Sequence, residues 1–147
     1  MPKLSRCFVR GGILSLAIGL IPGGLILIQK GTGWFPAFWV LLPAHTYLVL
    51  IGGMGQFTLG MCYWVLPRLD GGARGHTALA WSSYFLLNSA LALIIVHPLL
   101  EVWGGTMAAT LAFTSAGILQ SAAALTFVLH IWPRIRPATT PVPRRLS

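Results

Sequence analysis

The sequence predicts an all-α integral membrane protein, an up-down four-helix bundle with both termini in the cytoplasm. Its 147 residues, about one domain in length, are 56% hydrophobic and only 8% charged, with a mean hydropathy of +0.79. Soluble domains carry roughly 25% charged residues, so this composition argues against a soluble, a disordered or a nucleic-acid-binding protein. The formal net charge of +8 comes from cations beside apolar runs. Such cations indicate membrane topology and contacts with lipid head groups.

Four apolar stretches are long enough to cross a membrane, since a spanning helix needs about 20 apolar residues. They run over about 11–28, 37–66, 77–97 and 107–132. The connections between them are short and contain glycine or proline, so sequential helices are expected to be antiparallel neighbours. Residues 1–132 therefore form one transmembrane domain. The basic, Pro- and Arg-rich tail, 133–147, is predicted to be disordered.

The distribution of Lys and Arg predicts the orientation of the bundle. Nine of the ten cations fall in the N-terminal segment, the second connection and the tail, whereas Lys30 alone falls on the other side. Because cytoplasmic loops carry the excess of Lys and Arg, both termini are expected in the cytoplasm, as in a bacterial inner membrane. Tryptophans are expected at the two membrane interfaces: Trp34, Trp39 and Trp103 outside, and Trp64, Trp81 and Trp132 inside.

A cleaved signal peptide is the competing interpretation of the first apolar stretch, which has a basic start. Two features disfavour it. Pro22-Gly23-Gly24 interrupts the apolar run, and the small-residue triplet Gly31-Thr32-Gly33 comes only after Lys30. We therefore interpret this stretch as the first transmembrane helix.

Polar side chains within the predicted spans are informative because a membrane interior tolerates few of them. Four lie well inside: His45, Gln56, Asn88 and Gln120. For the three amides, the favoured interpretation is hydrogen bonding between helices. The functional alternative is that they line a cofactor pocket or a proton path.

His45 differs because its side chain is ionisable. It follows Trp39 by six residues, which places it about 9 Å below the outer interface at helical rise. Its helical face continues through Gly52 and Gln56, and the glycines leave a flat groove on that face. Such a groove suits a planar macrocycle, with His45 as a metal ligand. It equally suits close packing of helices, and both alternatives stay open on physical grounds.

The other histidines lie nearer to span ends. His97 precedes Pro98 on the same outer side as His45, where it is either a second ligand of a shared metal or haem, or an interfacial residue. The interfacial interpretation is favoured. His76 and His130 lie at the inner end, close to Arg74 and Arg134, and are also predicted to be interfacial.

A motif in the second span adds a resemblance. The stretch Pro43-Ala44-His45-Thr46 is followed by a glycine-rich middle and by the ending Gly60-Met61-Cys62-Tyr63-Trp64-Val65-Leu66-Pro67. This pattern resembles the second transmembrane helix of the haem-copper oxidase catalytic subunit, with the nitric oxide reductase and cbb3-type branches closest. The resemblance covers about a quarter of the chain. The other spans match only in topology and in the ending Leu129 to Arg134, as in a short protein that resembles the opening helices of that subunit.

The resemblance implies that His45 is an axial ligand of a low-spin haem b near the outer face. The family's second axial histidine and its copper ligands lie on later helices, and this chain ends before them. An outer arginine pair for the haem propionates is also missing from the sequence. The resemblance thus implies a haem protein that does not reduce oxygen or nitric oxide alone, with any second ligand coming from His97, another subunit or a dimer mate.

Two functions are therefore expected from the sequence. The first is a membrane-embedded b-type haem-binding protein or subunit in respiratory electron transfer, with His45 as iron ligand, Gly52 against the macrocycle, Gln56 as a nearby hydrogen-bonding group and His97 as a second ligand. The alternative is a haem-free accessory or assembly subunit of a respiratory membrane complex. The expected partners are other membrane subunits or further copies of the chain, an electron-transfer partner and lipid, but no nucleic acid. A small transporter or channel subunit is disfavoured, because neither of the two acidic residues, Asp70 and Glu101, lies deep in a predicted span.

Overall fold

The computed structural model describes residues 1–69 and 74–135, and within these residues the regular structure is entirely helical. These described residues contain four helical spans long and apolar enough to cross a membrane, so the protein is a multi-pass integral membrane protein. The first span is α1 (Lys3–Thr32). The second is divided into η1 (Pro36–Leu41), α2 (Leu42–Tyr47), η2 (Leu48–Gly55) and α3 (Gln56–Val65). The third is α4 (Thr77–Val102), and the fourth comprises α5 (Thr106–Ile131) and the short turn η4 (Trp132–Arg134).

These spans confirm the predicted four-helix architecture. The helices extend beyond the most apolar windows, and α1 in particular begins at Lys3 and includes the basic N-terminal segment. The bundle also includes residues that were assigned to the tail, because Arg134 in η4 is fully buried. The rest of the predicted disordered tail, from residue 136 onward, lies outside the described residues.

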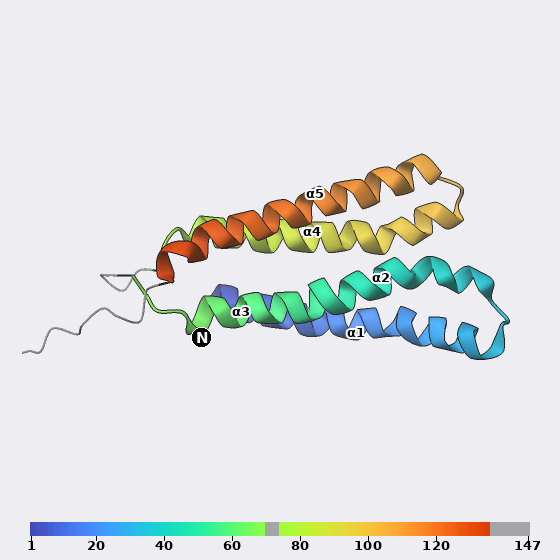
Figure 1. Ribbon diagram of the computed structural model, residues 1–147, viewed down its shortest axis with the longest axis horizontal. Helices are drawn as coiled ribbons and strands as arrows, with labels where there is room; N and C mark the ends of the chain where they lie inside the picture. Colours follow the sequence, from blue (N-terminus) through green and yellow to red (C-terminus); the bar gives the residue numbers. More distant parts are fainter. Residues whose placement is uncertain (70–73, 136–147) are drawn as a thin grey trace, which may run out of the picture.

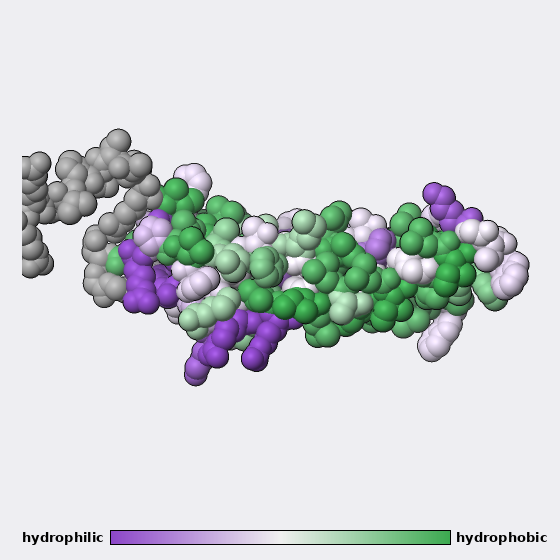
Figure 2. Space-filling model, turned by 90° about the horizontal axis from the view of Figure 1, so that it is seen from below, coloured by the Kyte–Doolittle hydropathy of each residue, from purple (hydrophilic) through white to green (hydrophobic). Residues whose placement is uncertain are grey.

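The spans form two helical hairpins (Figure 1). In the first hairpin α1 packs along α2, η2 and α3, and in the second α4 packs along α5. α1 begins and α5 ends at the same end of the bundle, here called the proximal end, and the α1–η1 and α4–α5 turns lie at the opposite, distal end. Figure 2, seen from the side of the first hairpin, shows a mostly hydrophobic surface along the bundle. That surface suits contact with lipid chains.

Glycines in the left-handed conformation end the helices at the distal end. Gly33 has a φ of 71° and donates its N–H to the Gln29 carbonyl at 2.8 Å, which terminates α1. Gly104 has a φ of 79° in the α4–α5 turn. Residues with a Cβ rarely adopt this conformation. The Gln29 side chain also accepts the N–H of Phe35, which ties the first turn to α1.

Two apolar clusters hold the hairpins together. The larger lies toward the proximal end, where Phe8 of α1 meets the rings of Tyr84 on α4 and Phe127 on α5 edge-on. The smaller is built largely from alanines, with Ala90 and Ala116 fully buried between α4 and α5. Small side chains let helix backbones approach closely, as is typical of packing inside membranes.

Candidate functional site

His45 lies on α2 with its imidazole packed against α1. Its Nδ1 atom is 2.9 Å from the Gly19 carbonyl oxygen. Because a carbonyl only accepts hydrogen bonds, Nδ1 carries a proton in this arrangement, and the matching neutral tautomer has its lone pair on Nε2. Among the described residues Nε2 has no hydrogen-bond partner. The ring is therefore oriented through one nitrogen and free to bind a ligand through the other.

The ring occupies space that a side chain on α1 would otherwise fill. A Cβ atom at Gly23 would lie only 2.5 Å from Cε1 of His45 and 2.7 Å from Nδ1. Glycine at this position is therefore what allows the imidazole to pack closely against α1. By contrast, a Cβ at the neighbouring Gly24 would meet nothing within 4 Å.

A groove of about 490 Å³ runs beside His45 on the first hairpin. Its lining is apolar apart from His45 and Lys30, and it includes Trp39 of η1 and the backbone of Gly23 and Gly24. All the lining residues belong to α1, η1 and α2. The groove thus combines an oriented imidazole, apolar walls and one cation, all from a single hairpin.

Gly52 and Gln56 lie elsewhere on the same interface. A Cβ at Gly52 would lie 2.7 Å from Cβ of Ser15, so this glycine brings η2 close to α1. Gln56 is completely buried, and its amide exchanges hydrogen bonds with Asn88 of α4 at 3.2 and 3.4 Å. The prediction of helix-to-helix hydrogen bonding is confirmed for these two amides. Neither Gly52 nor Gln56 lines the His45 groove.

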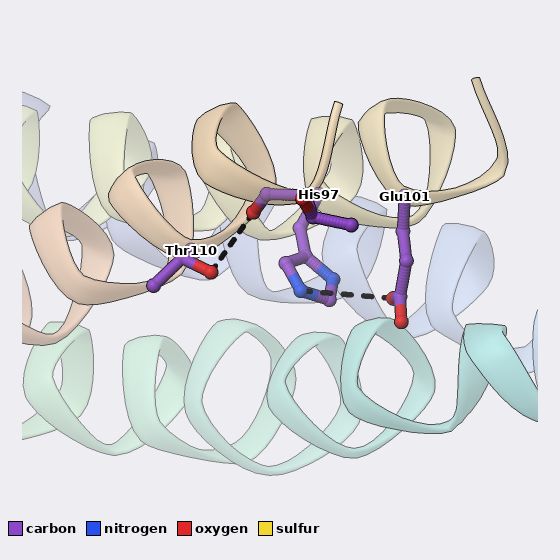
Figure 3. Close-up of polar contacts among 4 residues, drawn as sticks. His97, Glu101 and Thr110 are labelled. Atoms are coloured by element: carbon purple, nitrogen blue, oxygen red, sulfur yellow. Dashed lines mark hydrogen bonds and ion pairs between the residues drawn. The ribbon is translucent and has the colours of Figure 1, made fainter. Parts of the chain in front are cut away.

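His97 lies on α4, and its ring packs against Phe113 of α5. Its ring centroid is 5.0 Å from that of Phe113 on α5, and its Nε2 is 3.9 Å from a carboxylate oxygen of Glu101 (Figure 3). Its buried Nδ1 has no hydrogen-bond partner within the described residues. Like Gly52 and Gln56, His97 does not line the His45 groove.

A buried basic cluster at the proximal end was not apparent from the sequence. His130, predicted to be interfacial, and Arg134, assigned to the predicted tail, are 1% and 0% exposed. His130 stacks on Tyr63 at 5.3 Å, and Arg134 lies over the same ring at 5.5 Å. The i, i+4 spacing of His130 and Arg134 was the available signal, but it shows only that both share a helix face.

Arg134 caps the second span rather than facing solvent. Its guanidinium donates to the carbonyls of Tyr63 at 3.0 Å, Leu66 at 2.6 Å and Pro67 at 3.1 Å. Arg74 donates to the Tyr63 carbonyl at 3.1 Å. Carbonyls at a helix C-terminus have no partner within the helix, and cations there are favourable. The cluster therefore serves to fasten α3 to the end of α5.

The amide of Gln120 on α5 has a different environment. Its buried Nε2 has no hydrogen-bond partner in residues 1–69 and 74–135. Gln120 lines an apolar groove of about 620 Å³ whose walls come from η2, α3, α5 and Leu87 of α4. The helix-to-helix bond predicted for Gln120 is thus not formed by this nitrogen.

The described residues form a four-helix, multi-pass membrane protein in which the oriented His45 lies beside an open, mostly apolar groove. His130 is oriented in a similar way, with Nδ1 3.0 Å from the His76 carbonyl oxygen, but it is buried at the proximal end and lines neither the His45 groove nor the Gln120 groove. No three His, Cys, Asp or Glu side chains within the described residues come together as a metal-binding group. Comparison with known proteins matched no family model, no curated protein and no solved structure.

Proposed function

We propose that the chain is a membrane-embedded b-type haem-binding protein, or the haem-binding subunit of a respiratory complex, that serves electron transfer. The observation that carries the proposal is the orientation of His45, whose Nδ1 is bonded to the Gly19 carbonyl while Nε2 is free. Histidines that bind metals commonly donate their other ring N–H to a carbonyl or a carboxylate in this way. The motif around His45 supports the same role.

The residues of the groove fit a haem. Neutral imidazole is a common axial ligand of haem iron, and the walls of the groove are apolar, as the porphyrin faces require. Gly24 leaves open space in the groove beside the His45 imidazole, since a Cβ there would meet nothing within 4 Å. Lys30 supplies a cation for a propionate. When bound, the haem supplies one-electron redox chemistry, while the chain supplies the ligand, the orientation of the ring and exclusion of water.

His45→Ala tests the proposal directly. We expect the variant to insert into the membrane and to lose the absorbance bands of haem b, because the only histidine of the groove is gone. The measurement is an optical spectrum of the detergent-purified protein, oxidised and then reduced with dithionite. His76→Ala is the matched control, since that exposed histidine lies at the other end of the bundle. Retention of haem by His45→Ala would exclude the assignment.

A second candidate function is a haem-free accessory or assembly subunit. The observation that favours it is that the glycine face of the second span is already occupied by helix packing, since Gly52, Gly53 and Gly60 all contact α1. In this alternative the motif of the second span serves helix packing alone. A wild-type protein that stays colourless after addition of hemin, yet purifies with a respiratory complex, would support it.

We further propose that both termini face the cytoplasm of a bacterial inner membrane, with the distal end outside. The excess of Lys and Arg at the proximal end supports this orientation. Single cysteines introduced as Trp103→Cys and Thr77→Cys, in a protein lacking Cys7 and Cys62, test it. A membrane-impermeant maleimide is expected to label position 103 in intact cells and position 77 only after permeabilisation. The reverse pattern would contradict the orientation.

A further inference from the structure

Of the side-chain types that commonly bind haem iron, the lining of the His45 groove contains a single one, the imidazole of His45. Its lining comprises leucines, isoleucine, glycines, Trp39, Lys30 and His45, with no methionine, cysteine or tyrosine. His97 lies on the other hairpin, where it packs on Phe113. A six-coordinate haem in the groove therefore needs its second ligand from outside this chain.

The groove also lies on the outer surface of the molecule. It is built from α1, η1 and α2 alone, and the side chains of Leu20 and Leu27 in its lining are 61% and 69% exposed. Figure 2 shows a predominantly hydrophobic surface over the first hairpin. A planar ligand bound here would leave one of its faces open to the membrane.

A second copy of the chain would supply a second iron ligand and a second cation. Under two-fold symmetry the same surface patch lies on both sides of an interface, so a second His45 would face the first. Haem b carries two propionates, whereas one groove provides one cation, Lys30. Two grooves together provide two such cations. The open space at Gly24 lets the second copy approach, because no atom lies within 4 Å of a Cβ built there.

We propose that the groove is one half of a symmetric site in which two copies of this chain bind one haem b between their His45 side chains, with the two Lys30 ammonium groups on the propionates. This inference rests on the proposed function and deepens it by naming the partner. It assigns to the face of α1 and α2 the role of a homodimer interface that the haem completes.

The test uses the full chain, purified in detergent and titrated with hemin. We expect saturation at one haem for every two chains, a six-coordinate low-spin spectrum, and a dimer by light scattering. A heterodimer of wild type and His45→Ala, isolated through two different tags, is expected to shift to a five-coordinate spectrum. A purely structural role of His45 at the interface would not produce that spectral change.

Gly24→Leu provides a variant that keeps the ligand but fills the groove. We expect it to be monomeric and to bind hemin at least tenfold more weakly. Gly117→Leu on α5 is the matched control, because a Cβ at Gly117 also meets nothing within 4 Å. It is expected to behave as wild type.

Three results would overturn the shared site. One haem per monomeric chain with a five-coordinate spectrum would do so and leave the proposed function intact. A monomer with a six-coordinate spectrum that is lost in His97→Ala would replace the second copy with His97. A wild-type protein that stays colourless with hemin would overturn the proposed function and this inference together.

Discussion

At the scale of single residues, the position of the His45 ring depends on the absence of a side chain at Gly23 of α1. Its ring occupies the volume in which Gly23 would carry a side chain, and it bonds to the carbonyl of Gly19 one turn away. Both contacts come from α1, so the orientation of the imidazole depends on α1 as much as on α2. Gly19 and Gly23 thus position the side chain that we propose as the haem ligand.

Gly23→Leu is expected to displace the His45 ring and to weaken hemin binding by about tenfold to a hundredfold, the range found when groups that orient metal ligands are lost. The reason is the 2.5 Å approach between a Cβ at this position and Cε1 of His45. Hemin titration followed by absorbance measures the change.

Gly31→Leu is the control for that variant. It lies on the same helix and adds the same side chain where a Cβ meets nothing within 4 Å. Equal hemin affinity in Gly23→Leu and in wild type would show that contact with α1 does not position the ring.

At the scale of elements, the glycines of α1 and of the second span alternate along one interface. A Cβ at Gly12 would lie 3.0 Å from the Gly53 carbonyl oxygen, and one at Gly53 would lie 2.4 Å from the Leu16 side chain. Ser15 faces Gly52 in the same way. The interface coincides with η2, a π-helical stretch of eight residues that contains both Gly52 and Gly53. Close packing of helices therefore occupies the glycine face that the sequence left open to either packing or a ligand.

Gly12→Leu is expected to destabilise the first hairpin by about 1–3 kcal/mol, the usual cost of overpacking. The neighbours of a Cβ at this position are backbone atoms, the Gly53 oxygen at 3.0 Å and the Phe57 nitrogen at 3.1 Å, and these yield little. Unfolding in mixed detergent micelles, followed by circular dichroism, gives the difference in free energy.

Gly31→Leu again serves as the comparison, because it gains the same helix propensity without a neighbour within 4 Å. If both variants unfolded at the same denaturant concentration, the glycine interface would not govern the stability of the hairpin.

At the scale of the whole molecule, side chains of α5 reach across to the first hairpin at both ends. Phe113 meets Tyr47 edge-on at 5.8 Å, and Phe127 meets Phe8 at 6.1 Å. Arg134 completes the connection through its bonds to the last carbonyls of the second span. The four helices thus act as one bundle, although α1 with α2–α3 and α4 with α5 are the closest pairs.

Arg134→Ala is expected to lower the stability of the bundle by about 3 kcal/mol or more, since hydrogen bonds to charged groups contribute about 1.5–3 kcal/mol each and this side chain makes three. Arg134→Lys should recover only part of the loss, because an ammonium lacks the planar fork of the guanidinium. The exposed Arg6, changed to Ala, is the control. Unchanged unfolding of Arg134→Ala would argue that the α3 carbonyls need no cap.

The four spans, their antiparallel order and the amide pair of Gln56 and Asn88 as helix contacts were predictable from the sequence. Partition between water and lipid depends on the local run of apolar residues, and a polar group inside a span needs a partner wherever the helices meet. His45 was identifiable for the same reason, as an ionisable group within a span.

Only the tertiary structure shows which surfaces of the helices pack against each other. The sequence placed His45, Gly52 and Gln56 on one helical face and made α1 a neighbour, but it did not show which residues meet there. In the structure Gly23 lies against His45 and Ser15 against Gly52, while Gln56 also reaches Asn88 of α4. His130 was predicted to be interfacial and Arg134 to lie in the tail, but the packing of α5 and η4 buries both against Tyr63. The hydrophobicity of a helix sets its depth in the membrane, whereas contacts between helices depend on shape and hydrogen bonding across the bundle, because lipid tails are as apolar as the side chains that they replace.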